Sequence, residues 1–167
     1  SPSNVIVTYD GQVKVVDFGI AKARGNAFET GVGVMKGKLG YLAPEQFTGT
    51  PVDRRTDVFG LGILLWELLT NTRLFVRDSA AATMAAASVG EVPALSGFRD
   101  DLSPELEGIV QRALAHEPAA RFQTAGELRD ALEHFLRGEG LAPTPRDVAE
   151  WMQSLGGTRR AELKLAI

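Results

Sequence analysis

The segment from Asp57 to Thr70 constrains the fold of this chain more than any other. It reads DVFGLGILLWELLT, and Glu67 is its one internal charge. A helix that is apolar on every side must be buried on every side, so the segment predicts a central helix at about residues 56–70. Gly60 and Gly62 lower the helix propensity, which indicates that another element packs closely against the helix there.

Residues 4–17 read NVIVTYDGQVKVVD and predict a β-hairpin at about residues 5–16. Asp10-Gly11 stands between two β-branched stretches and favours a two-residue turn. In that register Asn4 lies opposite Asp17, and directly opposed Cβ atoms are roughly 4.5–5.5 Å apart. An amide oxygen and a carboxylate would then meet at one end of the hairpin. Such oxygens suit a hard cation, although a polar pair at a hairpin end is also common without a metal.

Further amphipathic helices follow the central one. Ser103-Pro104 gives an N-cap with Pro at the first helical position. Thr124 and Glu127 form a capping box before the next helix. A last helix is expected at about residues 145–155, with Gly156 ending it. The pattern therefore predicts an α+β fold that is mainly helical, with one small hairpin.

Five short motifs resemble, in the same order, those of protein kinases: the Asn that ends the catalytic loop, Asp-Phe-Gly, Ala-Pro-Glu, the Asp that opens the buried helix, and a late Pro-x-x-Arg. In this chain they are Asn4, Asp17-Phe18-Gly19, Ala43-Pro44-Glu45, Asp57 and Pro118-Ala119-Ala120-Arg121. The strings GYLAPEQ and HEPAARFQTAGEL are similar to those of bacterial serine/threonine kinases. We therefore expect a kinase C-terminal lobe over residues 1–138 and a C-terminal extension over residues 139–167.

The resemblance implies a nucleotide site. Asn4 and Asp17 would hold Mg²⁺ on the phosphates of ATP. Phe18 would pack beneath Asp17 as a switch, and Gly19 would be a flexible joint. Thr30, in the segment between Asp-Phe-Gly and Ala-Pro-Glu, is expected to be the activation-loop phosphorylation site.

The resemblance also implies structural roles and one departure from the family pattern. Glu45 and Arg121 would form a buried ion pair, and Asp57 would brace the catalytic loop from the central helix. Ser1 stands where most serine/threonine kinases have Lys, and Lys38 stands where they have Thr. Lys38 is therefore a candidate for the cation beside the γ-phosphate. The alternative is that Lys38 faces solvent or an acidic residue of the substrate.

We expect the chain to be a fragment, because it begins Ser1-Pro2-Ser3-Asn4 and carries neither a kinase-type Gly-rich loop nor an ATP-orienting Lys before Asn4. The catalytic Asp is expected just upstream of Ser1. The whole protein would then be a serine/threonine kinase acting on a protein substrate, with the fragment inactive alone, since kinase catalysis uses both lobes. The alternatives are a pseudokinase or docking module that binds partner proteins without catalysis, and a free-standing helical interaction domain. Preference for Ser/Thr over Tyr stays open.

Composition excludes several other classes. The chain has 18 Lys and Arg against 21 Asp and Glu, a net charge of −3, and a sequence pI near 5.4, so it lacks the basic surface that nucleic-acid binding requires. It has no Cys, which excludes disulfides and thiolate metal sites. The longest apolar run, residues 61–69, is far shorter than the ~18 residues of a membrane span. No signal peptide is visible, and we expect a cytoplasmic location.

Overall fold

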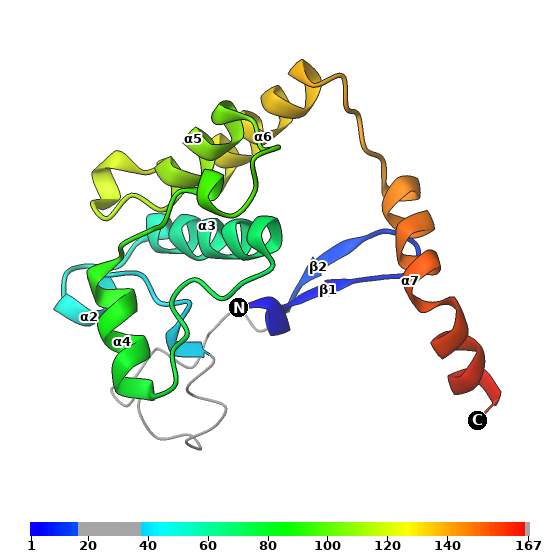
Figure 1. Cartoon of the computed structure of the whole chain (residues 1–167), viewed down its shortest axis with the longest axis horizontal. Helices are drawn as coiled ribbons and strands as arrows, with labels where there is room; N and C mark the ends of the chain where they lie inside the picture. The colour runs from blue at the N-terminus through cyan, green and yellow to red at the C-terminus, as the bar shows by residue number, and fades with distance from the viewer. Residues whose placement is uncertain (17–37, 166–167) are drawn as a thin grey trace. The chain divides into compact units, whose positions relative to one another are not determined.

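The computed structural model describes residues 1–16 and 38–165, with side chains as far as Leu155. The chain divides into two compact units (Figure 1). One comprises Phe28–Glu139 with Ser1, and the other comprises Pro2–Ala27 with Gly140–Ile167. The domain boundary expected after residue 138 stays a prediction.

The smaller unit contains the expected hairpin. A single 3₁₀ turn, η1 (Pro2–Asn4), leads into β1 (Val5–Val7), which pairs antiparallel with β2 (Val13–Val15). Val5 lies opposite Val15, and the amide of Val16 donates to the carbonyl oxygen of Asn4 at 2.8 Å. Asn4 therefore faces Val16, and the expected register, which placed it opposite Asp17, is wrong by one residue.

The turn explains the shift. The Gly11 amide donates to the Thr8 carbonyl oxygen at 2.9 Å, and the Thr8 amide donates to the Gln12 carbonyl oxygen at 2.8 Å. Gly11 has a φ of +82°, in the left-handed region. These contacts define a three-residue loop closed by a left-handed glycine instead of the two-residue turn. The Thr8 hydroxyl reinforces the loop, since it bonds both the amide and the carbonyl of Gln12 at 3.0 Å.

The C-terminal helix α7 (Pro145–Leu165) completes the smaller unit. It begins with a capping box: the Asp147 carboxylate accepts from the amide and the hydroxyl of Thr144 at 2.6 and 2.7 Å. The helix runs through Gly156, so the expected end there is wrong. Glycine weakens a helix interior by roughly 1 kcal/mol but does not by itself stop it. The start of α7 lies against the hairpin, where a Cβ on Gly11 would meet backbone at 1.7 Å.

The larger unit is helical in all its described elements. These are α2 (Glu45–Thr48), α3 (Arg54–Thr70), α4 (Ala80–Val89), η3 (Leu95–Gly97), α5 (Pro104–Ala113), η4 (Pro118–Ala120) and α6 (Ala125–Gly138). Within the part of the chain that the structure describes, no helix combines the length and the apolar character needed to cross a membrane.

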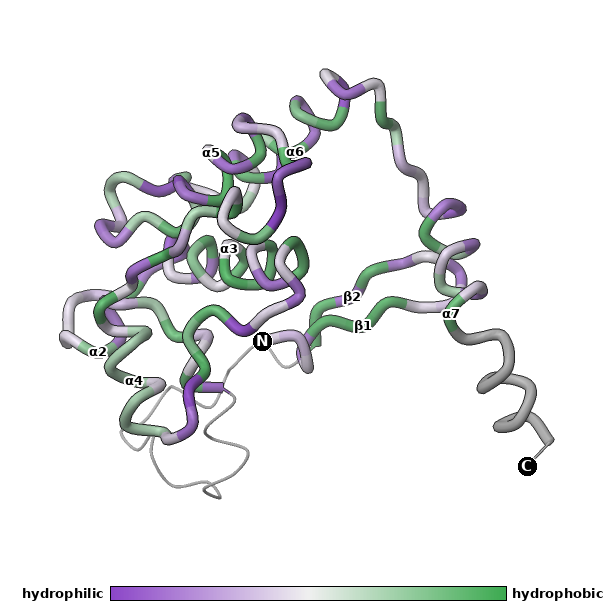
Figure 2. The backbone as a smooth tube through the Cα atoms, viewed as in Figure 1, coloured by the Kyte–Doolittle hydropathy of each residue, from purple (hydrophilic) through white to green (hydrophobic). Residues whose placement is uncertain are grey.

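Helix α3 is the centre of the larger unit, as the sequence predicts, and Figure 2 shows its hydrophobic character. It packs against α5, α6 and η3. Phe59, Ile63 and Trp66 on it are at most 2% exposed and belong to the main hydrophobic core. Burial on every side is wrong, however, because Leu61 is 39% and Leu68 is 80% exposed. These side chains project from the face that the other helices of this unit leave uncovered.

The residues predicted to cap the N-termini of α5 and α6 are confirmed. Ser103 caps α5, where its hydroxyl accepts from the amide of Glu105 at 3.1 Å. The Thr124 hydroxyl accepts from the amide of Glu127 at 3.1 Å, while the Glu127 carboxylate accepts from the amide of Gln123 at 2.8 Å. The capping box of α6 thus reaches one residue further back than the usual form.

The two glycines of α3 predict opposite responses to the same substitution. A Cβ on Gly62 would lie 2.9 Å from the Leu114 side chain and 3.1 Å from that of Ala113, so α5 packs tightly there. A Cβ on Gly60 would meet its nearest neighbour at 3.9 Å. We expect Gly60→Ala to stabilise the fold by up to about 1 kcal/mol through helix propensity. Gly62→Ala should be less stable than Gly60→Ala by roughly 1–3 kcal/mol, because it overpacks the α3–α5 contact.

Denaturant unfolding of both variants beside the wild type measures the difference. Equal changes in the free energy of unfolding for the two substitutions would contradict the close approach of α5 at Gly62.

Candidate functional site

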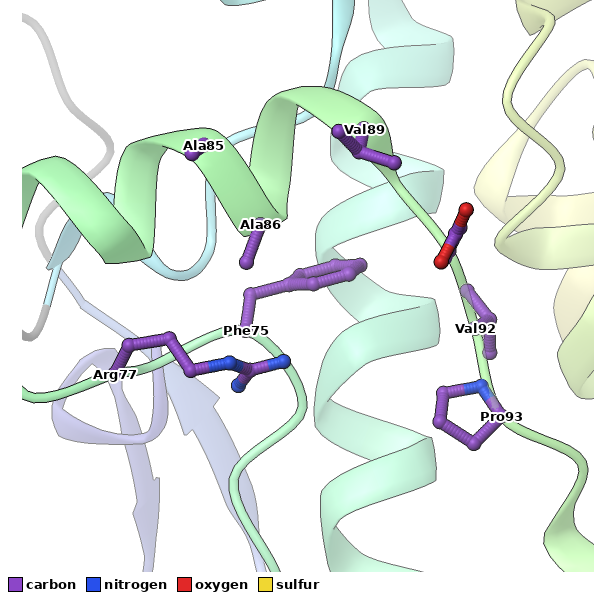
Figure 3. A pocket seen from close by; sticks show the side chains of 8 residues that line it. Phe75, Arg77, Ala85, Ala86, Val89, Val92 and Pro93 are labelled. Carbon is purple, nitrogen blue, oxygen red and sulfur yellow. The ribbon is translucent and has the colours of Figure 1, made fainter.

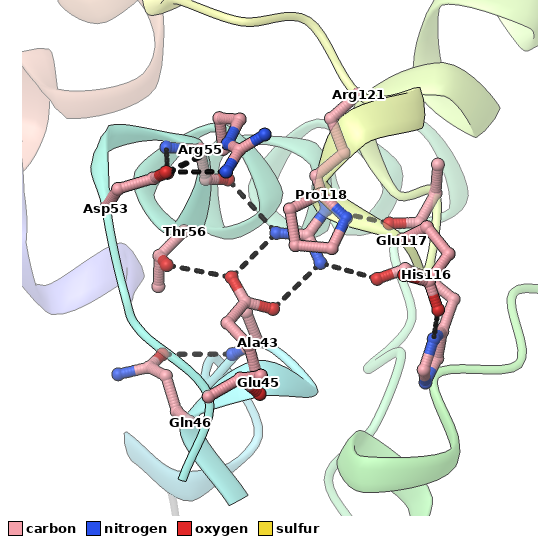
Figure 4. A network of polar contacts seen from close by, with 12 residues as sticks. Ala43, Glu45, Gln46, Asp53, Arg55, Thr56, His116, Glu117, Pro118 and Arg121 are labelled. Atoms are coloured by element: carbon pink, nitrogen blue, oxygen red, sulfur yellow. Dashed lines mark hydrogen bonds and ion pairs between the residues drawn. The ribbon is translucent and has the colours of Figure 1, made fainter. Parts of the chain in front are cut away.

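A buried ion pair joins Glu45, the first residue of α2, to Arg121, which follows η4 (Figure 4). Both guanidinium Nη atoms donate to the carboxylate at 2.8 Å, and the two side chains are 5% and 0% exposed. The remaining N–H groups of Arg121 donate to the carbonyl oxygens of Ala115 at 2.7 Å, His116 at 2.8 Å and Arg55 at 3.1 Å. Every donor of this guanidinium therefore has a partner, which is what a buried charge requires.

The pair also connects to α3. The Thr56 hydroxyl donates to Glu45 at 2.7 Å, and the Arg121 guanidinium lies 4.6 Å from the ring centroid of Phe59. Burial raises the pKa of Glu45, but the hydrogen bonds from Arg121 and Thr56 outweigh it, so its pKa lies below the usual value. The structure thus brings together Glu45 and Arg121, which sequence reasoning could connect only through the kinase resemblance.

The expected metal ligands are placed only in part. Asn4 is half-buried at the end of η1, and its side-chain oxygen accepts a long hydrogen bond of 3.4 Å from Ser3. Asp17 lies outside the described residues, and the observed register removes the geometric reason for placing the two side by side. Among the described residues, no three His, Cys, Asp or Glu side chains gather closely enough to hold a metal ion. The magnesium site therefore rests on the resemblance.

The other expected site residues are also only partly described. Phe18, Gly19 and Thr30 lie outside the described residues. Lys38 is exposed, and its carbonyl oxygen accepts from the amide of Tyr41 at 3.1 Å. Asp57 is exposed in the first turn of α3.

A second buried carboxylate was not assigned a role from the sequence. Glu67 on α3 is 8% exposed, and its carboxylate accepts from the Tyr41 hydroxyl at 2.5 Å, from Arg73 at 2.9 Å and from the Leu74 amide at 3.0 Å. Arg73 also donates to the Tyr41 hydroxyl. We call Tyr41, Glu67 and Arg73 the Glu67 cluster. The sequence did contain a signal for this cluster, because Glu67 is a lone charge in an apolar helix. A buried carboxylate needs hydrogen-bond or ionic partners.

A groove of about 540 Å³ lies along the C-terminal half of α4 (Figure 3). Its lining is mostly apolar, with Arg77 and Glu91 as the charged members. None of the residues expected from the sequence to bind a ligand lines this groove.

Comparison with known proteins decides the family. A sequence profile of the protein kinase domain matches residues 1–135, most of the chain. The chain belongs to the protein kinase family. The Glu45–Arg121 ion pair therefore joins the Ala-Pro-Glu motif of a kinase to its late Pro-x-x-Arg motif.

Several bacterial kinases are similar to this chain. The tyrosine-protein kinase MasK of Myxococcus xanthus is 48% identical over 147 residues, which cover 86% of this chain and 23% of MasK. The probable serine/threonine-protein kinase SCO3848 of Streptomyces coelicolor is 43% identical, with coverages of 86% and 22%. The serine/threonine-protein kinase PknB of Mycolicibacterium smegmatis is 41% identical, with coverages of 83% and 22%. The chain thus spans less than a quarter of the length of these relatives.

Removing the cation of the buried pair should destabilise this kinase strongly. Arg121→Met leaves Glu45 buried without its partner, which typically costs about 3–5 kcal/mol in the free energy of unfolding. The matched control is Arg129→Met. Arg129 makes a 2.6 Å ion pair with Asp130, but both side chains are about two-thirds exposed, at 67% and 64%. Such a pair contributes about 1 kcal/mol or less. Both variants are measured by denaturant unfolding. Similar losses in the free energy of unfolding would contradict the inference that burial makes the Glu45–Arg121 pair the more important of the two.

The pair should also make stability depend on acid pH. The pKa of Glu45 is lowered in the folded protein from its ordinary value of 4.5. Its ionised form therefore stabilises the fold above that ordinary value, and this contribution is lost as the pH falls through the lower pKa of the folded state. The stability difference between the wild type and Glu45→Gln should shrink as the pH falls below 4.5.

Asp101→Asn is the control, because Asp101 pairs with Arg99 at the exposed surface, where solvent screens the interaction, so this substitution should change stability little across the same pH range. A difference for Glu45→Gln that stays constant with pH, in melts from pH 7 to pH 3, would show that Glu45 does not titrate in this way.

Proposed function

We propose that this chain is part of a kinase that transfers the γ-phosphoryl group of ATP to a serine or threonine hydroxyl of a protein substrate. The observation that carries the proposal is the match to the protein kinase domain across residues 1–135. The formed Glu45–Arg121 pair supports it, because it joins two of the five motifs that carry the resemblance. SCO3848 and PknB are named serine/threonine kinases, whereas MasK is named a tyrosine kinase. The proposed preference for serine or threonine over tyrosine therefore follows SCO3848 and PknB.

Asn4 and Asp17 are the residues that would hold Mg²⁺. They offer an amide oxygen and a carboxylate, and both are hard oxygen ligands of the kind this ion prefers. The long bond from Ser3 leaves the Asn4 oxygen able to exchange partners. When bound there, the ion would supply positive charge to the phosphates of the nucleotide. ATP is the nucleotide that the family resemblance implies.

The remaining assignments concern the activation segment and its support. In this proposal Phe18 and Gly19 belong to the switch that follows Asp17, and Thr30 is the phosphorylation site of the activation segment. A phosphate on Thr30 would add about −1.5 to −2 charge, which nearby basic side chains can pair. Asp57 would brace the catalytic loop from the first turn of α3.

The nucleotide site can be tested with matched carboxylate substitutions in the full-length protein. Asp17→Asn should lower phosphoryl transfer to a general protein substrate by about 10²-fold or more, because it removes a metal ligand. Asp10→Asn makes the same chemical change in the hairpin turn, where the side chain is exposed, and should leave the rate near that of the wild type. Phosphoamino-acid analysis of the product identifies the hydroxyl that is modified.

A full-length protein that binds partner proteins but transfers no phosphate under these conditions would support the docking module instead. The residue at the catalytic position expected just upstream of Ser1 distinguishes the two: Asp there supports the enzyme, and Asn or Gly supports the docking module.

Lys38 is proposed as the cation that replaces the Lys absent at Ser1. Positive charge near the γ-phosphoryl group stabilises the transition state, and losing one such contact typically costs about 10²–10³ in rate. Lys38→Met and Lys38→Thr should each lower kcat at least tenfold with little change in ATP binding. Ser1→Lys should partly restore the Lys38→Thr variant. An unchanged kcat with a raised KM for the protein substrate would instead make Lys38 a substrate-docking residue.

A further inference from the structure

Glu67 accepts hydrogen bonds from three residues in two other parts of the chain. One carboxylate oxygen accepts from the Leu74 amide at 3.0 Å, and the other accepts from Tyr41 at 2.5 Å and from Arg73 at 2.9 Å. Tyr41 belongs to the end of the activation segment, Glu67 to α3 and Arg73 to the loop after α3. Arg73 is 58% exposed, yet its guanidinium supplies the positive charge that compensates a carboxylate with only 8% exposure.

The same two loops touch at a second point. A Cβ on Gly40 would lie 2.6 Å from the Val76 side chain and 3.3 Å from its backbone nitrogen. Leu39, beside it, is 5% exposed. Residues 39–41 therefore lie against residues 73–76, with the Glu67 cluster at one end of the contact. The amides of Tyr41 and Leu42 close local turns by donating to Lys38 and Leu39 at 3.1 and 3.3 Å.

The charge balance makes Arg73 the critical member of the cluster. Burial, followed by the Glu67 carboxylate, raises the pKa of Tyr41, so its hydroxyl stays protonated and donates to Glu67. A hydrogen bond to a charged group is stronger than a neutral one, and here Arg73 contributes to both partners. Without Arg73, the carboxylate would be held by a hydroxyl and a backbone amide alone, in a setting that disfavours uncompensated charge.

We propose that Arg73 is a positioning residue for the protein substrate, acting through Glu67 and Tyr41 to hold residues 38–42 in place. The inference rests on the proposed kinase function, in which Lys38, at the start of this segment, lies beside the γ-phosphoryl group that is transferred to the protein substrate. In this proposal Arg73 acts through Glu67 and Tyr41 and not by direct contact with the substrate or the nucleotide. Its removal should therefore weaken the binding of the protein substrate and leave ATP binding unchanged.

The test uses the full-length protein and four variants: Arg73→Met, Arg73→Lys, Tyr41→Phe and the control Arg77→Met. Arg77 lies in the same loop and donates to the carbonyl oxygens of Leu74 and Val76 at 2.9 and 3.1 Å. Two quantities are measured for each variant. One is the KM for the protein substrate against the KM for ATP, and the other is hydrogen–deuterium exchange at the amides of residues 39–43.

Arg73→Met should raise the KM for the protein substrate roughly tenfold or more, the ratio that a lost charged hydrogen bond represents, with the KM for ATP unchanged. The amides of Tyr41 and Leu42 should exchange faster by a similar factor, while exchange in α3 stays as in the wild type. Arg73→Lys should recover part of both effects, since it restores the charge. Tyr41→Phe should reproduce them, and it decides the matter if Arg73→Met fails to fold.

An Arg73→Met variant that matches Arg77→Met in both measurements would overturn the inference. Faster exchange with an unchanged KM in an active protein would overturn it too, because the segment would then not position the substrate. A wild type that transfers no phosphate at all would refute the proposed function instead. In that case exchange at Tyr41 and Leu42 alone decides whether Arg73 holds the segment.

Discussion

The larger unit depends on one buried guanidinium. Arg121 comes from the loop after η4 and is held by Glu45 and by three backbone carbonyl oxygens, so it connects α2, the start of α3 and the loop that follows α5. Its partners lie far apart in sequence, and Glu45 is 76 residues away. Charge burial makes this arrangement selective, because a displaced partner leaves an uncompensated charge in the core. The apolar core supplies most of the burial energy, whereas the ion pair fixes how these elements meet.

Local signals predicted the helices well. The N-cap of α5 and the capping box of α6 depend on residues within four positions of one another, and both are present. The central helix also followed from its own composition. The composition of the helix does not account for its exposed Leu68, because burial depends on which faces the neighbouring elements cover and not on the helix alone. The end of α7 was misplaced because a glycine ends a helix only where the backbone turns left-handed.

In the hairpin, an ambiguity in the type of turn changes the predicted position of Asn4, a candidate metal ligand. Asp10-Gly11 can form a two-residue turn by itself, or it can be the last two residues of a three-residue loop. The two arrangements differ by one residue in strand register. The hydroxyl of Thr8, which bonds twice to Gln12, favours the longer loop. The shift of one residue makes Val16, instead of Asp17, the residue opposite Asn4. The argument for a metal site therefore depends on the family resemblance and not on strand pairing.

Two ion networks lie four residues apart along the chain, and together they explain why the end of the activation segment is fixed. Tyr41 is bonded to Glu67, in the last turn of α3, whereas Glu45 is bonded to Thr56, in its first turn. A helix rises about 1.5 Å per residue, so these attachment points lie roughly 16 Å apart along α3. Only four residue steps separate Tyr41 from Glu45, and Pro44 among them has helical backbone angles, so this stretch is not fully extended. Residues 41–45 are thus attached near both ends of α3, at Tyr41 through Glu67 and at Glu45 through Thr56.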